Sequence, residues 1–321
     1  MTFLAYLFSI LKYVIYGSSV FFTGALTQST DVLDVLSLRF LMSFAVLWIL
    51  KVTRIVKINV GIKSIFVKNE RTPHIRTLIF AALFEPVLYM LFETLGISMS
   101  SNVMTAVILS LLPIASIVCE TLILKERTTW LQKLFLILGV AGVIYIAIMS
   151  ETGGQGDSVL GIVFLLCAVV CGALFLVFSR KASSHFSAFE VTYFSCMLGA
   201  AAFNSVNVIR HIVAQDILHY FDPYFDPNNL VGFVFLAILS TVAATSMGNF
   251  ALGRIQPSTM TALSGVSMLT TVAVGVIFNK EPLYYFHYIG LALIVARMVG
   301  VSAISISRDA KLRKQLPRNE K

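Results

Sequence analysis

The sequence predicts an all-α integral membrane protein with ten transmembrane helices in two inverted five-helix repeats, and with N- and C-termini in the cytoplasm. Apolar composition, an uneven distribution of basic residues and an internal repeat predict this class. Of the 321 residues, 58% are hydrophobic and 12% are charged, whereas a soluble domain has about 25% charged residues. This composition excludes a soluble enzyme, a disordered chain and a disulfide scaffold. The net charge of +8 does not indicate nucleic-acid binding, because membrane proteins collect Lys and Arg in cytoplasmic loops.

A transmembrane helix needs about 20 consecutive, mostly apolar residues. Apolar runs of about this length, separated by polar breaks, occur along the whole chain. No basic segment of the kind found in a cleavable signal peptide precedes the first run, so we expect that run to be a true span. The predicted spans are residues 4–26, 32–52, 76–97, 102–124, 131–149, 159–179, 188–208, 230–252, 258–279 and 285–306.

The basic residues fall almost entirely on one side of this topology. With a cytoplasmic N-terminus, nineteen of the 24 Lys and Arg residues lie in cytoplasmic loops and in a basic cytoplasmic tail, 308–321. Arg210 and Lys280 are external, while Lys12, Arg39 and Arg297 lie within spans. Because Lys and Arg mark cytoplasmic loops, this split supports ten spans with both termini inside.

The two halves of the sequence repeat each other. A Leu-Gly pair, a Met-Thr-Ala triplet and a Lys-Glu pair occur in the same order in each half. Five spans are an odd number of crossings, so the second copy is inverted across the membrane, as is typical of secondary transporters. We therefore divide the chain into repeats 1–150 and 151–307. The matching segments are 95–96, 104–106 and 125–126, and then 252–253, 260–262 and 280–281.

Short motifs in the first half carry a family resemblance. They are Tyr16-Gly17-Ser18-Ser19, Leu38-Arg39-Phe40, Ser100-Ser101-Asn102, and Pro113 followed by Glu126-Arg127. In their order and spacing, the chain resembles the drug/metabolite transporter superfamily, EamA type, over nearly its whole length. It departs from the family pattern at Tyr16, where Trp is common, and in the second half, where Met268 replaces Pro113 and Pro282 follows Glu281.

The resemblance implies a carrier with ten spans, often an exporter of amino acids, other metabolites or drugs. It implies a central cavity lined by spans 1–4 and 6–9, and it favours a bacterial plasma membrane as the location. Spans 5 and 10 are then peripheral, so a homodimer through these spans is one expected assembly. The resemblance does not fix the substrate.

Ionisable residues within spans are functional candidates, because they are costly in lipid. At about 1.5 Å per residue, Glu85 and Lys12 both lie near mid-membrane and could meet. Arg39 lies nearer the external face, where Glu93 or Asp34 could pair with it. Structural or gating roles are expected for Arg39, Glu120, Glu126, Glu281 and Arg297, since ion pairs and helix ends account for charges at such positions.

Glu85, Tyr89 and Glu93 are spaced by four residues and form a polar stripe on one helix. Pro86 weakens the backbone beside Glu85, and a kinked span with a polar stripe suits the wall of a cavity. Glu85 either binds a cationic group, or exchanges it for a proton, or forms a structural salt bridge with Lys12. These alternatives stay open at the level of sequence.

Smaller polar residues complete the set of binding candidates. Tyr16 lies in the first span, Thr245 and Asn249 follow helical spacing in the eighth, and Ser264 lies in the ninth. Asn249 is the strongest candidate of the second half, because an amide needs partners on both of its polar atoms. Small polar residues also join membrane helices without any ligand, which is the competing interpretation for each of them.

These features predict a secondary transporter that exports small metabolites by alternating access, with proton coupling as one mode. The alternatives are a facilitator or exchanger without ion coupling, a channel or structural membrane partner and, less favoured, a polytopic membrane enzyme. No cluster of Cys, His or Asp with metal-ligand spacing is found. We therefore predict no metal and no cofactor, and we expect the lipid bilayer, a small-molecule substrate and, in a possible homodimer, a second copy of the chain as partners, with no nucleic acid.

Overall fold

The computed structural model describes residues 2–58, 72–124, 158–255, 263–280 and 283–293, with isolated positions of 130–149, 257–260 and 295–304. All regular elements in this part of the chain are helical, as predicted. Seven helical stretches are long and apolar enough to cross a membrane. They match predicted spans 1–4 and 6–8, while the ninth contains a shorter apolar helix. Predicted spans 131–149 and 285–306 lie partly or largely outside the described residues.

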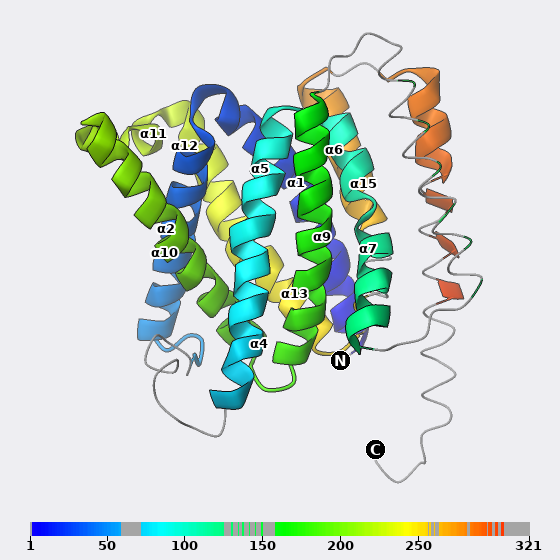
Figure 1. Cartoon of the computed structure of the whole chain (residues 1–321), viewed down its shortest axis with the longest axis horizontal. Helices are drawn as coiled ribbons and strands as arrows, with labels where there is room; N and C mark the ends of the chain where they lie inside the picture. The colour runs from blue at the N-terminus through cyan, green and yellow to red at the C-terminus, as the bar shows by residue number, and fades with distance from the viewer. Residues whose placement is uncertain are drawn as a thin grey trace.

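The helices run roughly side by side along the bundle (Figure 1). Several spans consist of two or three consecutive helical segments. The main segments are α1 (Thr2–Ser29), α2 (Val32–Val52), α4 (Thr72–Ala82), η1 (Leu83–Leu88), α5 (Tyr89–Ser98), α6 (Asn102–Leu109), α7 (Leu112–Cys119), η2 (Glu120–Leu124), α9 (Val159–Ala182), α10 (Ala188–Ala214), η3 (Ile217–His219), α11 (Asp222–Phe225), α12 (Pro227–Val234), η4 (Phe235–Ala244), α13 (Thr245–Leu252) and α15 (Gly265–Phe278).

Side-chain caps define where several spans begin. The first four backbone N–H groups of a helix have no partner within it. Asp31 accepts a hydrogen bond from the Leu33 N–H at the start of α2, and Ser101 accepts one from Met104 at the start of α6. Ser187 and Glu190 form a reciprocal capping box at the start of α10. These caps fix the tight turns between successive spans.

The third span is interrupted at Pro86, as the sequence predicts. Glu85 has φ −138° and ψ 118°, which are not helical values. Proline lacks the backbone N–H and disfavours the helical conformation of the residue before it. The span therefore consists of α4, η1 and α5, and the break places the Glu85 side chain inside the bundle, where it is 7% exposed.

The two repeats pack through matching pairs of spans. The third span packs on α9, the first span of the second repeat, just as α1 packs on η4 and α13, which belong to the eighth span. In the same way, α7 packs on α9 and α1 on α15. The pairs α2 with α10 and α6 with α15 each join equivalent spans of the two repeats. This pattern is that of two similar halves related by an approximate twofold axis.

The first span and the third span run in the same direction. Tyr16 of α1 contacts Glu85 of the third span, and further along both helices Gly24 lies against Ile97. The eighth span runs opposite to α1, since Phe22 stacks on Phe235 at a ring-centroid distance of 4.3 Å, whereas Tyr16 contacts a later residue of that span.

The first span of the second repeat, α9, runs opposite to the third span. Gly96 lies against Leu165, whereas the earlier Phe80 stacks on the later Phe178. Because α1 and the third span run in the same direction, α9 is inverted relative to α1. The predicted inversion of the second repeat is therefore present in the described helices.

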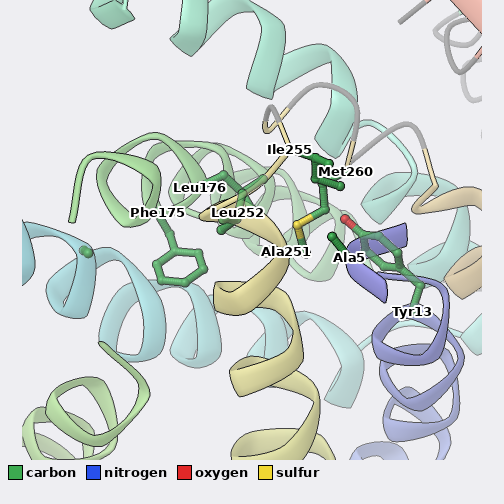
Figure 2. Close-up of a cluster of buried hydrophobic side chains, with 9 residues drawn as sticks. Ala5, Tyr13, Phe175, Leu176, Ala251, Leu252, Ile255 and Met260 are labelled. Carbon is green, nitrogen blue, oxygen red and sulfur yellow. The ribbon is translucent and has the colours of Figure 1, made fainter. Parts of the chain in front are cut away.

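A cluster of buried side chains joins both repeats at the end of the bundle where the chain begins. Tyr13 of α1, Phe175 and Leu176 of α9, and Leu252 of α13 are all at most 3% exposed. Figure 2 shows these side chains together with Met260. Lipid is as apolar as leucine, so close packing rather than the hydrophobic effect holds such helices together. This core brings side chains of α1, α9 and α13 into contact at that end of the bundle.

Candidate functional site

The Tyr16 hydroxyl joins the two repeats near the middle of the bundle. It donates a hydrogen bond to Glu85 Oε1 over 3.3 Å, and it lies 2.9 Å from Thr245 Oγ1. Because the Tyr16 proton is directed at Glu85, Thr245 donates the second bond. Glu85 is 7% exposed and Thr245 is 8% exposed. A carboxylate of the first repeat is thus connected through one phenol to a hydroxyl of the second repeat.

Lys12 faces the same phenol from one helical turn earlier. Its Nζ lies 4.8 Å from the centre of the Tyr16 ring and 5.6 Å from that of Tyr13, within the range of cation–π attraction. Lys12 and Glu85 also attract each other electrostatically. Over the described residues, however, no ion pair within 4.0 Å joins them. Lys12 and Glu85 therefore both contact Tyr16, as their predicted proximity implies, but they form no direct salt bridge.

Near Lys12, Tyr16 and Glu85, Tyr89 donates a short hydrogen bond of 2.6 Å to Glu93 Oε1. Both residues border a cavity of about 40 Å³ between the first, third, fourth and ninth spans. This volume holds water but no metabolite, since one water needs about 10–15 Å³ of such space. Four of the predicted candidates line this cavity, namely Tyr16, Tyr89, Glu93 and Ser264. The complete lining consists of Tyr13, Tyr16, Val20, Tyr89, Glu93, Ala106, Leu109, Ser110, Leu112, Ser264, Ser267, Met268 and Thr271.

Arg39 does not form the direct pair that the sequence suggested. Its Nε donates to Thr241 over 2.8 Å and its Nη2 to Ser240 over 3.1 Å, and the side chain is 2% exposed. The predicted ion pair with Glu93 or Asp34 is absent from the described contacts. The reason is geometric: α2 packs on η4, so the hydroxyls of η4 reach the guanidinium first. Glu93 acts on Arg39 at longer range.

Asp34 instead binds two basic residues of α10. Its Oδ2 lies 2.7 Å from Arg210 Nη2, and its Oδ1 lies 2.9 Å from His211 Nε2. Asn207 also donates to Asp34, and Asp216 lies 2.9 Å from the other ring nitrogen of His211. The sequence analysis missed this cluster because it placed Arg210 in an external loop. The spacing of 207, 210 and 211 on one helical face is the signal that could have revealed it.

Asn249 lies apart from the small cavity and holds three helices together. Its Nδ2 donates to Thr192 of α10 over 3.0 Å, and its Oδ1 accepts from Ser179 of α9 over 2.9 Å. The amide thus finds partners on both sides, as the sequence analysis required, but these partners belong to the protein. This arrangement favours a role in helix packing.

A second cavity, of about 810 Å³, lies where α10 begins and α13 ends. Its charged lining residue, Arg254, is exposed. The candidate site is therefore assigned to the smaller cavity, which has the buried charge beside it. The larger cavity is lined by Phe8, Ser183, Phe186, Ser187, Ala188, Phe189, Val242, Ala243, Ser246, Met247, Asn249, Phe250, Gly253 and Arg254.

The remaining charged residues that were predicted as candidates lie away from the small cavity or outside the described residues. Glu120 is buried at the start of η2, at the far end of the fourth span from Ser101. Glu126, Glu281 and Arg297 lie outside the described residues, so their structural or gating roles stay predictions.

Comparisons with known proteins agree with one another and point to one family of transporters. The model of the EamA-like transporter family matches residues 3–148 and 159–303, one match in each half. The chain is 29% identical over 307 residues to "Uncharacterized transporter YcxC" of Bacillus subtilis (strain 168), covering 96% of this chain and 95% of that protein. It is also 29% identical over 160 residues to "Uncharacterized transporter in sor 3'region" of Acidianus ambivalens, covering 50% and 58% of the two chains.

A solved structure of another protein superposes with a TM-score of 0.65 at 16% identity, over 94% of this chain and 98% of that one. At this identity the likeness concerns the fold alone. The two family matches follow the two repeats seen in the helix packing, and they point to a transporter rather than an enzyme. The chain belongs to the EamA-like transporter family.

Proposed function

We propose that this protein is a proton-coupled secondary transporter that exports small metabolites, such as amino acids, related compounds or drugs, from a bacterial cell. The observation that carries the proposal is the Tyr16 hydroxyl, which connects Glu85 of the first repeat with Thr245 of the second. A site at the interface of inverted repeats near the membrane midplane is the arrangement that alternating access requires.

The buried charges support a functional role for this interface. Lys12 and Glu85 are 4% and 7% exposed within helices that span the bilayer. Ionisable groups in such positions cost free energy and mark ion or substrate pathways by default. Glu85 lies where the third span leaves helical geometry, and broken helices line the binding sites of many transporters.

Proton coupling follows from the chemistry of the Glu85 contacts. The ionised carboxylate accepts the Tyr16 hydrogen bond and attracts Lys12. When Glu85 takes up a proton, the attraction to Lys12 is lost and the hydrogen bond weakens, because a neutral carboxyl is a poorer acceptor. Tyr16 is then free to move with Thr245 and the second repeat. Protonation is therefore linked to the contact that holds the repeats together.

The larger cavity supplies an access route. It adjoins the turn between α9 and α10, and Arg180 and Lys181 at the end of α9 mark this end as cytoplasmic under the positive-inside rule. Phe8, in its wall, lies one helical turn before Lys12. We assign this cavity as the cytoplasmic vestibule through which the substrate approaches the interface.

The test is flux into proteoliposomes loaded with a mixture of amino acids and other metabolites, with and without a proton gradient. Saturable counterflow that the gradient stimulates is the expected result. Counterflow indifferent to the gradient would instead make the protein a facilitator or exchanger, and ionic currents without saturation would make it a channel. An absence of flux for every compound would contradict transport of these metabolites.

A further inference from the structure

We propose that His211 is a second proton-binding site of this protein, at the external end of the bundle, and that its proton fastens the two repeats together there. The inference rests on the proposed transport function and extends its proton coupling beyond the interface at the middle of the bundle. The site belongs to a group of charged side chains that we call the external cluster: Asp31, Asp34, Arg210, His211 and Asp216.

The external cluster joins the first repeat to the second. Asp34 Oδ2 of α2 lies 2.7 Å from Arg210 Nη2 of α10, and Asp34 Oδ1 lies 2.9 Å from His211 Nε2. Arg210 Nη1 also lies 2.6 Å from Asp31 Oδ1, and Asp31 caps the start of α2. These contacts tie the first turn of α2 to the last turn of α10, two equivalent spans that pack along each other.

Hydrogen-bond geometry indicates the charge of the His211 ring. Each ring nitrogen lies 2.9 Å from a carboxylate oxygen, Nε2 from Asp34 and Nδ1 from Asp216. A neutral imidazole has one donor and one acceptor, and only the imidazolium form has two donors. A neutral ring would therefore direct a lone pair at a carboxylate oxygen. The arrangement is satisfied when His211 carries both ring protons.

Solvent can deliver the proton that His211 holds. The His211 side chain is 8% exposed, whereas that of Asp216, beside Nδ1, is 45% exposed. Arg210 Nη2 lies 3.4 Å from Nε2, and the Tyr220 ring packs edge-on against the imidazole with 5.2 Å between the ring centroids. The titratable and charged groups that face the ring are Asp34 from α2, Arg210 from α10, and Asp216 and Tyr220 from the segment after α10.

Loss of this proton weakens the connection between the repeats. The external cluster contains three acidic side chains, which Arg210 and the charged His211 ring balance in part. A neutral ring leaves Arg210 as the remaining cation of the cluster and donates to one of its two acidic partners only. Because hydrogen bonds between charged groups are stronger than neutral ones, the cluster opens more readily once the proton has left.

The location of the external cluster gives the proton a place in the transport cycle. The segment that follows α10 leads to α11, at the opposite end of the bundle from the N-terminus (Figure 1). Under the positive-inside rule, which places Arg180 and Lys181 in the cytoplasm, this end faces the outside. A proton taken up from the outside therefore favours closure of the external end, which in an exporter is the step after substrate release.

The first experiment follows the His211 protons by nitrogen NMR of the full chain in detergent, labelled at its five histidines. The signal that is missing from His211→Gln identifies the residue. We expect both ring nitrogens to be protonated at about pH 7, and one proton to leave as the pH rises towards about 9. A ring that is neutral at pH 7 would overturn the site.

Matched variants test the partner of Nδ1. Asp216→Asn should lower the midpoint of the His211 titration by about one pH unit, because a carboxylate that favours the charged ring is removed. Asp222→Asn is the control, since Asp222 lies 2.6 Å from Nδ1 of the exposed His219 instead. It should leave the His211 midpoint in place. Equal midpoints in the wild type and in Asp216→Asn would contradict the assignment.

The second experiment measures whether the proton holds α2 against α10. Amide hydrogen exchange of residues 32–36, corrected for the intrinsic effect of pH, should show protection that falls by about fivefold or more between about pH 6 and 9. His219→Gln should behave as the wild type does, whereas protection in His211→Gln should not change with pH. Asp216→Asn keeps the ring and should lose protection at lower pH, so the test does not depend on His211→Gln alone. Protection that ignores pH in the wild type would overturn the fastening role.

Flux separates this inference from the transport proposal. Gradient-driven flux of His211→Gln in proteoliposomes should fall by about fivefold or more, while His219→Gln transports as the wild type does. Unchanged flux in His211→Gln overturns the role of this proton in the cycle and leaves the transporter standing. A His211 titration that controls exchange at the start of α2, without flux of any compound, supports the site and contradicts the proposed transport.

Discussion

At the scale of single residues, the Tyr16 hydroxyl forms the contact on which the site depends. Tyr16→Phe removes both of its hydrogen bonds and keeps the ring over which Lys12 lies. We expect a stability loss of about 1–3 kcal/mol, because Glu85 loses a buried donor, together with a drop in flux of about tenfold or more, equivalent to at least about 1.4 kcal/mol in the barrier. Thermal unfolding in detergent and flux in proteoliposomes measure the two effects. Tyr193→Phe is the control, and unchanged flux in Tyr16→Phe would remove this hydroxyl from the mechanism.

Lys12 and Glu85 provide a second test at this scale. Each is buried, and each attracts the other although no ion pair within 4.0 Å joins them in the described part of the chain. Lys12→Ala and Glu85→Ala should each destabilise the protein, because each leaves one buried charge without its opposite. The double variant should recover part of the loss, with a coupling energy of about 0.5–3 kcal/mol. A double-mutant cycle of unfolding free energies measures this coupling, and strictly additive losses would refute it.

Depth along a span could be predicted from the sequence, but the partner of each side chain could not. Counting residues from the membrane faces brought Lys12 and Glu85 to one level, and both lie beside Tyr16 in the structure. The same counting proposed acids for Arg39, which binds hydroxyls of η4 instead. Depth does not define which faces of two helices meet. Hydroxyl residues are also too common in membrane helices to indicate one contact.

At the scale of elements, α1 approaches α15 closely at Gly17. A Cβ added at Gly17 would lie 2.7 Å from Thr270 Cβ and would also strike the Ser267 carbonyl. Gly17→Ala should therefore force the helices apart and destabilise the protein by about 1–3 kcal/mol. Gly24→Ala on the same helix meets only Ile97, at 3.7 Å, and should be tolerated. Unfolding temperatures of the two variants test this, and equal temperatures would contradict the close approach.

Most spans could be predicted because length and hydropathy alone define them. Seven helices of the described chain match predicted spans, and Pro86 correctly located the interruption of the third. The π-helical segments η1 and η4 were not predicted. A span that is apolar on nearly all faces has no periodic pattern from which a change of helical pitch can be read. The contacts of Asp34 with Arg210 and His211 were missed because the α10 helix extends beyond the predicted span into the expected loop.

At the scale of the whole molecule, the inverted repeats give the bundle two different ends. At the end that holds the N-terminus, Tyr13, Leu252 and their neighbours form a tightly packed core. Near the other end, Asp34 of the first repeat binds Arg210 and His211 of the second. The candidate site lies between these two clusters, and the alternating access that we propose would require each of them to open in turn. The homodimer expected through spans 5 and 10 stays a prediction.

The most direct test of the account compares proton-driven accumulation of substrate by Glu85→Gln and by the wild type in the same proteoliposomes. Gln keeps the size of Glu but cannot release a proton. We predict that accumulation driven by a proton gradient is abolished in Glu85→Gln, while the variant inserts and folds as the wild type does. Normal accumulation by the variant would contradict the coupling role of Glu85 and leave the Tyr16–Glu85 contact with a structural role.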